Sequence, residues 1–204
     1  MHRLITLLLP LALISCNNPI KDKIAEERKA NEKVVSPEES TVHDLPKDLN
    51  EISGITFLND SVLLAIQDEE GIIFYYNIKQ NKIIKKQTFA DNNDYEDLVI
   101  AGNDIYTITS KGLIHQIKDF ESSKPVVKSY KTAFTEKNDI EGLAYDAKNN
   151  RLLIAPKEAG LDKDKTTKEI YGFDLKTMTL QSKTVYTIHL SEIEAQFKGD
   201  ALEE

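Results

Sequence analysis

Three stretches of the sequence place acidic residues directly before apolar runs that are typical of strands. They read "LNEISGITF" (residues 49–57), "NDYEDLVIA" (residues 93–101) and "NDIEGLAYD" (residues 138–146). The step from Glu51 to Glu96 is 45 residues, and the step from Glu96 to Glu141 is again 45. Carboxylates that recur at a fixed spacing are candidate ligands for a hard cation such as Ca²⁺, or for a substrate.

Strands must position these acidic residues, because the sequence from about residue 44 consists of short β-rich runs separated by turn residues. Each unit of about 45 residues contains four strand candidates, and those of the first unit are "ISGITF", "SVLLAIQ", "IIFYYNI" and "KIIKKQTF". A period of 40 to 50 residues with four strands per unit is typical of a β-propeller blade. A β-sandwich is the alternative, but it leaves the spacing of the carboxylates unexplained. We therefore expect an all-β fold, a β-propeller with four-stranded blades.

The first strand of each propeller blade lines the central channel, so Glu51, Glu96 and Glu141 are expected to converge at one rim. In a four-stranded meander, the loop after the second strand returns to the same rim. That loop contains Asp68 in the first unit and Glu158 in the third, each 17 residues after the glutamate of its unit. We therefore predict a shared acidic site formed by these five residues.

Carboxylates crowded at a rim repel one another, and a pair about 5 Å apart costs roughly 3 kcal/mol at an effective dielectric constant near 20. A bound Ca²⁺, a raised pKa on one carboxyl group, or hydrogen bonds from strand amides would offset this cost. Asp94 and Asp139 precede two of the glutamates and are interpreted either as support for the ligands or as turn caps. Lys157 is a candidate anion-binding residue. The sequence leaves these alternatives open.

Other kinds of chemistry find little support in the sequence. It contains no Gly-x-Ser-x-Gly, P-loop, dinucleotide-binding or His-Glu-x-x-His motif. His43, His115 and His189 stand alone, so we expect no zinc site. The formal net charge of −8 argues against nucleic acid as a partner.

The amino terminus is interpreted as a targeting segment. Residues 1–15, "MHRLITLLLPLALIS", combine an early arginine with an apolar run that is too short for a permanent membrane-spanning helix. Cys16 is the only cysteine, and "LIS" before it resembles the lipobox of bacterial lipoproteins. An ordinary signal peptide with an incidental cysteine is the alternative. We expect cleavage before Cys16, acylation there and a lipid anchor in the bacterial cell envelope, with the outer membrane or the periplasmic face favoured.

The mature chain is predicted to have two parts. Residues 16–43 are rich in Lys, Glu and Asn and contain no aromatic residue, so we interpret them as the lipidated terminus and a flexible charged linker. Residues 44–204 are interpreted as the propeller blades.

The motifs "LNEISGITF", "DYEDLVI" and "NDIEGLAYDAKNNRLLIAPKE" resemble the SdiA-regulated family of bacterial envelope β-propellers, which is related to proteins described as esterase-like phytases. The resemblance covers roughly residues 45–175. It implies a propeller in the cell envelope and raises phytase-like hydrolysis as an alternative function. The second unit departs from the family pattern, because it has Glu96-Asp97 in place of Glu-Gly and no acid in residues 110–112.

We therefore expect a lipid-anchored propeller whose acidic rim binds a cation, a small molecule or a partner protein. The alternative is a Ca²⁺-dependent hydrolase of phosphoesters or esters, in which the ion acts as a Lewis acid. Residues 49–204 amount to about three and a half units, whereas a closed propeller needs at least four blades. We expect this chain to be a fragment of a longer product, or to close by pairing with another molecule.

Overall fold

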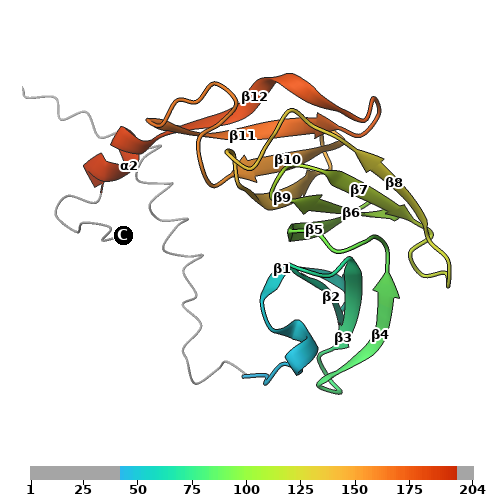
Figure 1. The fold of residues 1–204 in the computed structure, drawn as a ribbon. Coiled ribbons are helices and arrows are strands. Elements are labelled where there is room, and N and C mark those ends of the chain that lie inside the picture. The colour runs from blue at the N-terminus through green and yellow to red at the C-terminus, as the bar shows by residue number, and fades with distance from the viewer. Residues whose placement is uncertain (1–41, 197–204) are drawn as a thin grey trace, which may run out of the picture. The chain divides into compact units, whose positions relative to one another are not determined.

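The computed structural model describes residues 42–196, which form three four-stranded sheets, a 3₁₀ helix and an α-helix (Figure 1). After η2 (Lys47–Leu49), the first sheet contains β1 (Ile52–Asn59), β2 (Val62–Gln67), β3 (Ile72–Asn77) and β4 (Lys82–Thr88). The second contains β5 (Tyr95–Ala101), β6 (Asp104–Thr109), β7 (Ile114–Lys118) and β8 (Val126–Tyr130). The third contains β9 (Ile140–Asp146), β10 (Arg151–Pro156), β11 (Thr167–Asp174) and β12 (Thr179–His189), and α2 (Leu190–Gln196) follows it.

Each sheet is an antiparallel meander in which every strand pairs with the next one along the chain. Polar turn residues make the short connections. The Asn59 side-chain oxygen accepts hydrogen bonds from the backbone N–H groups of Ser61 and Val62, at 3.0 and 3.1 Å, which closes the turn between β1 and β2. Asn81 and Asn150 occupy the left-handed backbone region, with φ of 51° and 48°, which asparagine tolerates better than most residues.

The hydrophobic core lies between neighbouring sheets. Leu64 and Ile66 of β2 pack with Leu98 and Ile105 between the first and second sheets. Between the second and third sheets, Ile108 belongs to a buried cluster with Tyr106, Ile114, Leu143, Leu152, Ile154 and Phe173. β2 and β6 have neighbours on both faces, so most of their residues are buried. The sequence of β2 is accordingly a nearly continuous apolar run, whereas β6 also buries Thr107 and Thr109.

The arrangement confirms the expected all-β fold with propeller blades. The first strand of each sheet lies beside the first strand of the next, so β1, β5 and β9 follow one another in space, and β4 and β8 lie at the outside of their sheets (Figure 1). The described residues contain three blades and therefore form part of a propeller, which closes with four or more. Whether this chain is a fragment or pairs with another molecule stays a prediction.

Several predictions about the amino terminus fall on residues outside the described range. They are the signal peptide in residues 1–15, the acylated Cys16 and nearly all of the charged linker. Within residues 42–196, no helix is long and apolar enough to cross a membrane. His115 is buried in strand β7, where its ring contacts Phe89 and Tyr95.

Candidate functional site

The site is built at the ends of the sheets where β1, β5 and β9 begin. Three backbone hydrogen bonds mark equivalent positions there. The N–H groups of Asp68, Ser110 and Lys157 donate to the carbonyl oxygens of Glu51, Asp94 and Asp139, at 3.4, 3.0 and 2.7 Å. The loop after the second strand therefore returns to the start of the first strand in every blade, as the sequence predicted.

These hydrogen bonds correct the alignment of the glutamates. Glu51 is equivalent to Asp94 and Asp139, and the position of Glu96 and Glu141 is taken by Ser53 in the first blade. The first strands begin at Ile52, Tyr95 and Ile140, so the first step is 43 residues and the second is 45. Glu51 lies two positions earlier in its blade than Glu96 does in the second blade, and the first blade is two residues shorter. These two differences offset each other, so the step from Glu51 to Glu96 is 45 residues although the two glutamates are not equivalent.

A β-bulge positions each of these equivalent side chains. In β1 the pairing with β2 passes from Ile52 to Gly54 and omits Ser53. In the same way, the register omits Glu96 in β5 and Glu141 in β9. Such bulges recur at barrel rims and beside active sites, because the unpaired residue directs its side chain away from the regular ladder. The two glutamates therefore project from the rim of neighbouring blades.

Four carboxylates from the second and third blades act on one another at this rim. The pKa of Glu96 is raised to about 7, first by burial and then by the charges of Asp94, Glu141 and Asp139. Within the described residues, the first-blade acid Glu51 is not among the charges that raise this pKa. We call Asp94, Glu96, Asp139 and Glu141 the acidic rim.

Lys157 lies against the acidic rim. Its Nζ is 2.8 Å from Oε1 of Glu141 and 3.6 Å from Oδ2 of Asp139. The hydrogen bond to Glu141 is the largest cause of the raised pKa of Lys157. The prediction that Lys157 binds an anion stays a prediction, and its ammonium group already has two carboxylate partners. Because all three side chains are substantially exposed, solvent screens these ion pairs and they contribute little to stability.

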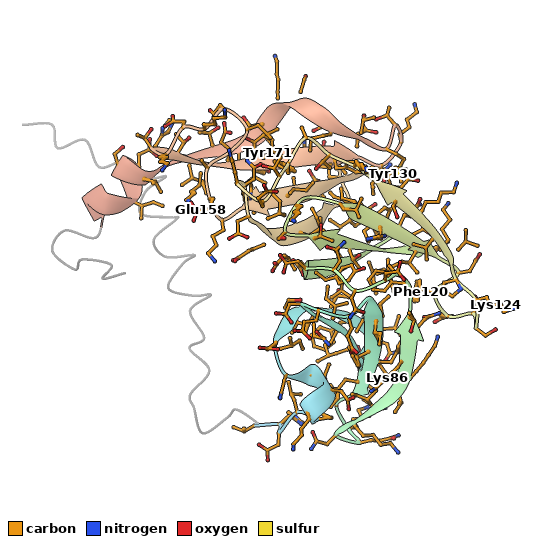
Figure 2. All side chains as sticks on the ribbon, viewed as in Figure 1. Lys86, Phe120, Lys124, Tyr130, Glu158 and Tyr171 are labelled. Atoms are coloured by element: carbon orange, nitrogen blue, oxygen red, sulfur yellow. The ribbon has the colours of Figure 1, made fainter. Side chains whose placement is uncertain are left out.

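The other two predicted acids lie on the rim loops, as expected. Asp68 is half-buried, its carbonyl oxygen accepts a hydrogen bond from Tyr95 N–H at 2.8 Å, and its buried Oδ1 has no partner among the described residues. Glu158 is exposed, and its N–H donates to the carbonyl oxygen of Asn138 at 3.1 Å (Figure 2). Asp68 therefore links the first blade to the second, and Glu158 lies beside the start of β9.

The acidic rim is not a preformed metal centre. Among residues 42–196, no group of three or more His, Cys, Asp or Glu side chains is arranged to hold a metal ion. Carboxylate oxygens suit Ca²⁺ chemically, and the bound ion stays a prediction. Of the three ways to offset the repulsion, the structure contains the raised pKa of Glu96, and it adds the Lys157 ion pairs.

Asp97 is a residue of this region whose role the sequence did not reveal. Its Oδ2 accepts a hydrogen bond from the N–H of Leu143 in β9 at 2.8 Å, and its Oδ1 accepts one from Leu98 N–H at 2.8 Å. A Cβ on Gly54 of β1 would lie only 2.8 Å from the Asp97 Cα. Asp97 therefore joins the first strands of two blades and fits closely against a third. The only signal in the sequence was an acid where the other units have glycine.

Comparisons with solved structures found propellers of other kinds. The chain is similar to Kuenenia stuttgartiensis hydrazine synthase (13% identity, TM-score 0.49, covering 68% of this chain and 37% of that one). It is also similar to streptogramin B lyase (16% identity, TM-score 0.46, covering 64% and 39%). A third match is the β-propeller domain of Cps50 (Swd1) from Myceliophteria thermophila (12% identity, TM-score 0.44, covering 74% and 48%). The chain therefore spans less than half the length of each of these proteins.

Comparisons of sequence gave two results. A search of curated proteins found no match. The family model described as SdiA-regulated matches residues 33–199, which is most of the chain and includes all three blades. This match confirms the resemblance carried by the rim motifs, and the chain belongs to the SdiA-regulated family.

Proposed function

We propose that this protein is a binding module of the bacterial cell envelope and that the acidic rim binds a cation or the cationic group of a ligand. The observation that carries the proposal is the convergence of four carboxylates from two neighbouring blades, with Lys157 paired to two of them. The rim carries more negative charge than Lys157 neutralises. A bound cation would offset the remaining repulsion, which is roughly 3 kcal/mol for a pair of charges about 5 Å apart.

Lys157 supports this proposal, because its ammonium group shows that a cation is accommodated between Glu141 and Asp139. Ca²⁺ is the natural probe, since it accepts six to eight oxygen ligands in flexible geometry. Without a preformed three-acid group among the described residues, Ca²⁺ would have to displace Lys157 and draw the carboxylates together. We therefore expect binding to be modest in affinity.

The protonation of Glu96 makes the proposed binding pH-dependent. With a pKa of about 7, Glu96 is protonated in much of the population at pH 6 and ionised at pH 8. A cation favours the ionised form, so binding should release a proton and should strengthen as the pH rises through 7.

The experiment measures the melting temperature of the full chain at pH 8 with increasing Ca²⁺. Binding to the folded state alone adds about 2.7 kcal/mol at a concentration 100 times Kd, which raises Tm by several degrees. The double variant Glu96→Gln with Glu141→Gln should lose this response, and a chelator should reverse it in the wild type.

The matched control is Asp60→Asn with Glu121→Gln. It removes the same charge from exposed loops that lie away from the starts of β1, β5 and β9. It should respond to Ca²⁺ as the wild type does. An unchanged Tm up to millimolar Ca²⁺ would mean that the rim acids do not bind this ion. An equal loss of response in the control would mean that Ca²⁺ acts only through the total charge.

We also propose the envelope location and the lipid anchor, with Cys16 as the acylated residue. The support is the sequence before Cys16 and membership of a family that the motifs relate to envelope propellers. The net charge of −8 opposes a general electrostatic attraction of the whole protein to anionic headgroups or nucleic acid. Acyl chains at Cys16 would therefore hold it at the membrane.

Hydrolysis of a phosphoester or ester is the second candidate function. The specific observation in its favour is Glu96, since a carboxyl group with a pKa of about 7 suits general acid–base catalysis at neutral pH. A bound Ca²⁺ would supply Lewis-acid activation. The test is turnover of a general phosphoester substrate that requires Ca²⁺ and is lost in Glu96→Gln and in Glu141→Gln. Ca²⁺ binding without turnover would leave the binding function and remove the hydrolytic one.

A further inference from the structure

A second candidate site lies at the same ends of the sheets, next to the four carboxylates of the acidic rim. It is a pocket of about 450 Å³ between residues 133–138, which lead into β9, and the loop that joins β10 to β11. Its lining includes Lys137 and Asn138 from the first segment and Glu158, Gly160, Lys163 and Lys165 from the loop. We call it the lysine pocket.

The two walls of the lysine pocket are tied together by Asn138, which is only 7% exposed. Its side-chain oxygen accepts a hydrogen bond from Thr135 N–H at 2.9 Å, within its own wall. Its Nδ2 donates to the carbonyl oxygens of Ala159 and Gly160 in the other wall, at 3.0 and 3.3 Å. One buried amide therefore sets the spacing of the walls.

The loop wall is also held against the third sheet. The hydroxyl of Tyr171 on β11 accepts a hydrogen bond from Leu161 N–H at 2.7 Å and donates one to Glu169 (Figure 2). Gly160 lies so close to Tyr171 and Glu169 that any side chain there would collide with both. The pocket is therefore built before any ligand arrives, which lowers the entropic cost of binding.

Three of the residues that line this pocket are lysines. Lys137 comes from one wall and Lys163 and Lys165 from the other, while Glu158 is the only acid in the described lining. None of these three lysines takes part in the ion pairs formed within residues 42–196. Lys163 also has a left-handed backbone with φ of 64°, which is uncommon for a lysine and recurs at binding sites.

A smaller pocket extends the same pattern toward the second blade. It has a volume of about 230 Å³, and Lys111 and Lys131 are its charged lining residues. The segment between the pockets contributes alternate residues to each, with Thr132 and Phe134 in the smaller pocket and Ala133 and Thr135 in the lysine pocket. Five lysines thus line two adjoining hollows in a chain whose net charge is −8.

We propose that the lysine pocket is an anion-binding site and that it takes a multiply charged oxyanion group, such as a phosphate. Three lysines with no carboxylate partner in the described structure line a preorganised hollow, and their ammonium groups would form charge-assisted hydrogen bonds to phosphate oxygens. The phosphate belongs either to a free small molecule or to a lipid headgroup. This proposal does not depend on cation binding at the acidic rim.

The test uses pyrophosphate as the probe and measures its binding to the full chain by calorimetry at constant ionic strength. The triple variant Lys137→Gln, Lys163→Gln and Lys165→Gln should bind roughly tenfold more weakly or worse. All three side chains are exposed, so the variant should fold, and its melting temperature without pyrophosphate checks this.

The matched control is Lys79→Gln, Lys124→Gln and Lys176→Gln, which removes the same charge from exposed positions outside the pocket. Lys124 lies on the opposite side of the drawn sheets from Glu158 (Figure 2). The control should bind pyrophosphate as the wild type does. No binding by the wild type, or an equal loss in the control, would overturn the proposal.

A second arm distinguishes the two sources of phosphate. It measures co-sedimentation of the Cys16→Ser chain, which lacks the acylated residue, with phosphatidylcholine vesicles that do or do not contain phosphatidic acid, whose phosphate monoester can be doubly charged. Pocket-dependent binding to the anionic vesicles identifies a lipid headgroup as the source, and pyrophosphate binding alone identifies a free phosphorylated molecule. If neither probe binds in a way that needs the three lysines, the pocket is not an anion site.

Discussion

Asp97 illustrates how a single side chain replaces missing backbone pairing in this fold. The first strands of neighbouring blades are not paired with each other, and Asp97 provides a direct hydrogen bond from β5 to Leu143 in β9. Burial raises the pKa of Asp97, while the hydrogen bonds from the Leu143 and Leu98 N–H groups oppose that rise. The Asp97 carboxylate therefore links two blades at a position where the other units have glycine.

We predict that Asp97→Ala lowers the free energy of unfolding by about 1–3 kcal/mol, because it leaves the Leu143 N–H without its partner. Urea denaturation measures the change. Glu121→Ala is the control, since Glu121 is exposed in a loop, and it should stay within about 0.5 kcal/mol of the wild type. Equal effects in the two variants would show that the link between β5 and β9 has no energetic role.

Glu96 should make stability depend on pH. Its folded-state pKa of about 7 lies above the usual value of 4.5, so the folded state binds more protons than the unfolded state between these values. The contribution to stability is therefore fully present below pH 4.5 and is lost as the pH rises through 7. Glu96→Gln lacks this loss, so relative to the wild type it should be more stable at pH 8 than at pH 5.

Urea denaturation at pH 5 and pH 8 measures this difference. The control is Glu136→Gln, an exposed acid in the segment before β9, which should show the same difference from the wild type at both values. If Glu96→Gln behaves like this control, the acidic rim does not raise the pKa of Glu96.

At the scale of elements, packing between neighbouring blades stabilises the fold, and the bulges position the acidic side chains of the site. Strands β2 and β6 are largely buried on both faces, whereas the outermost strand β4 alternates between exposed residues and residues that are mostly only partly buried. The bulges at the starts of β5 and β9 interrupt pairing at the rim, and Glu96 and Glu141 are the residues left out of the register. Strands β5 and β9 thus each contribute core residues further along the strand and an acidic residue at its start.

Substitutions in a strand buried between blades and in an outermost strand should lower the free energy of unfolding by different amounts. Ile108 in β6 is fully buried between the second and third blades, so Ile108→Ala should lower the free energy of unfolding by about 2–5 kcal/mol. Ile84 in β4 is 48% exposed, and Ile84→Ala should cost far less. Thermal or urea unfolding of both variants measures the difference, and similar losses would contradict the interface as the main source of stability.

At the scale of the whole molecule, opposite charges occupy neighbouring parts of one rim. The acidic rim lies at the starts of β5 and β9, and the lysine pocket lies beside it around Asn138. A ligand with both cationic and anionic groups would therefore find partners for each within one region. The proposed anchor at Cys16 would hold the protein at the membrane.

We predict that Cys16→Ser moves the protein from the membrane fraction to the soluble fraction. Each acyl methylene group buried in the bilayer contributes about 0.8 kcal/mol, and the variant loses the residue that would carry the chains. Fractionation followed by mass spectrometry of the mature amino terminus measures both effects. Ser36→Ala, in the same linker, should remain in the membrane fraction. A Cys16→Ser protein that stays equally membrane-bound would refute the lipobox interpretation.

The sequence alone determined the fold class and half of the acidic rim. Alternating and continuous apolar runs with turn residues specify strands, because side chains in a strand point to opposite faces with a period of two. Repetition then places equivalent residues of successive blades at the same rim. This is why Glu96 and Glu141 take equivalent positions in neighbouring blades, whereas Glu51 is equivalent to Asp94 and Asp139.

The tertiary structure alone decided which charges meet. Ser53 rather than Glu51 is equivalent to Glu96, because bulges and loop lengths set the register and a repeat count does not show them. Lys137 and Lys165 come from different loops, and only the folded arrangement of the Asn138 hydrogen bonds brings them to one pocket. Spacing along a chain predicts neighbours within a repeated element, whereas contacts between irregular loops depend on how the packed sheets place the loop ends.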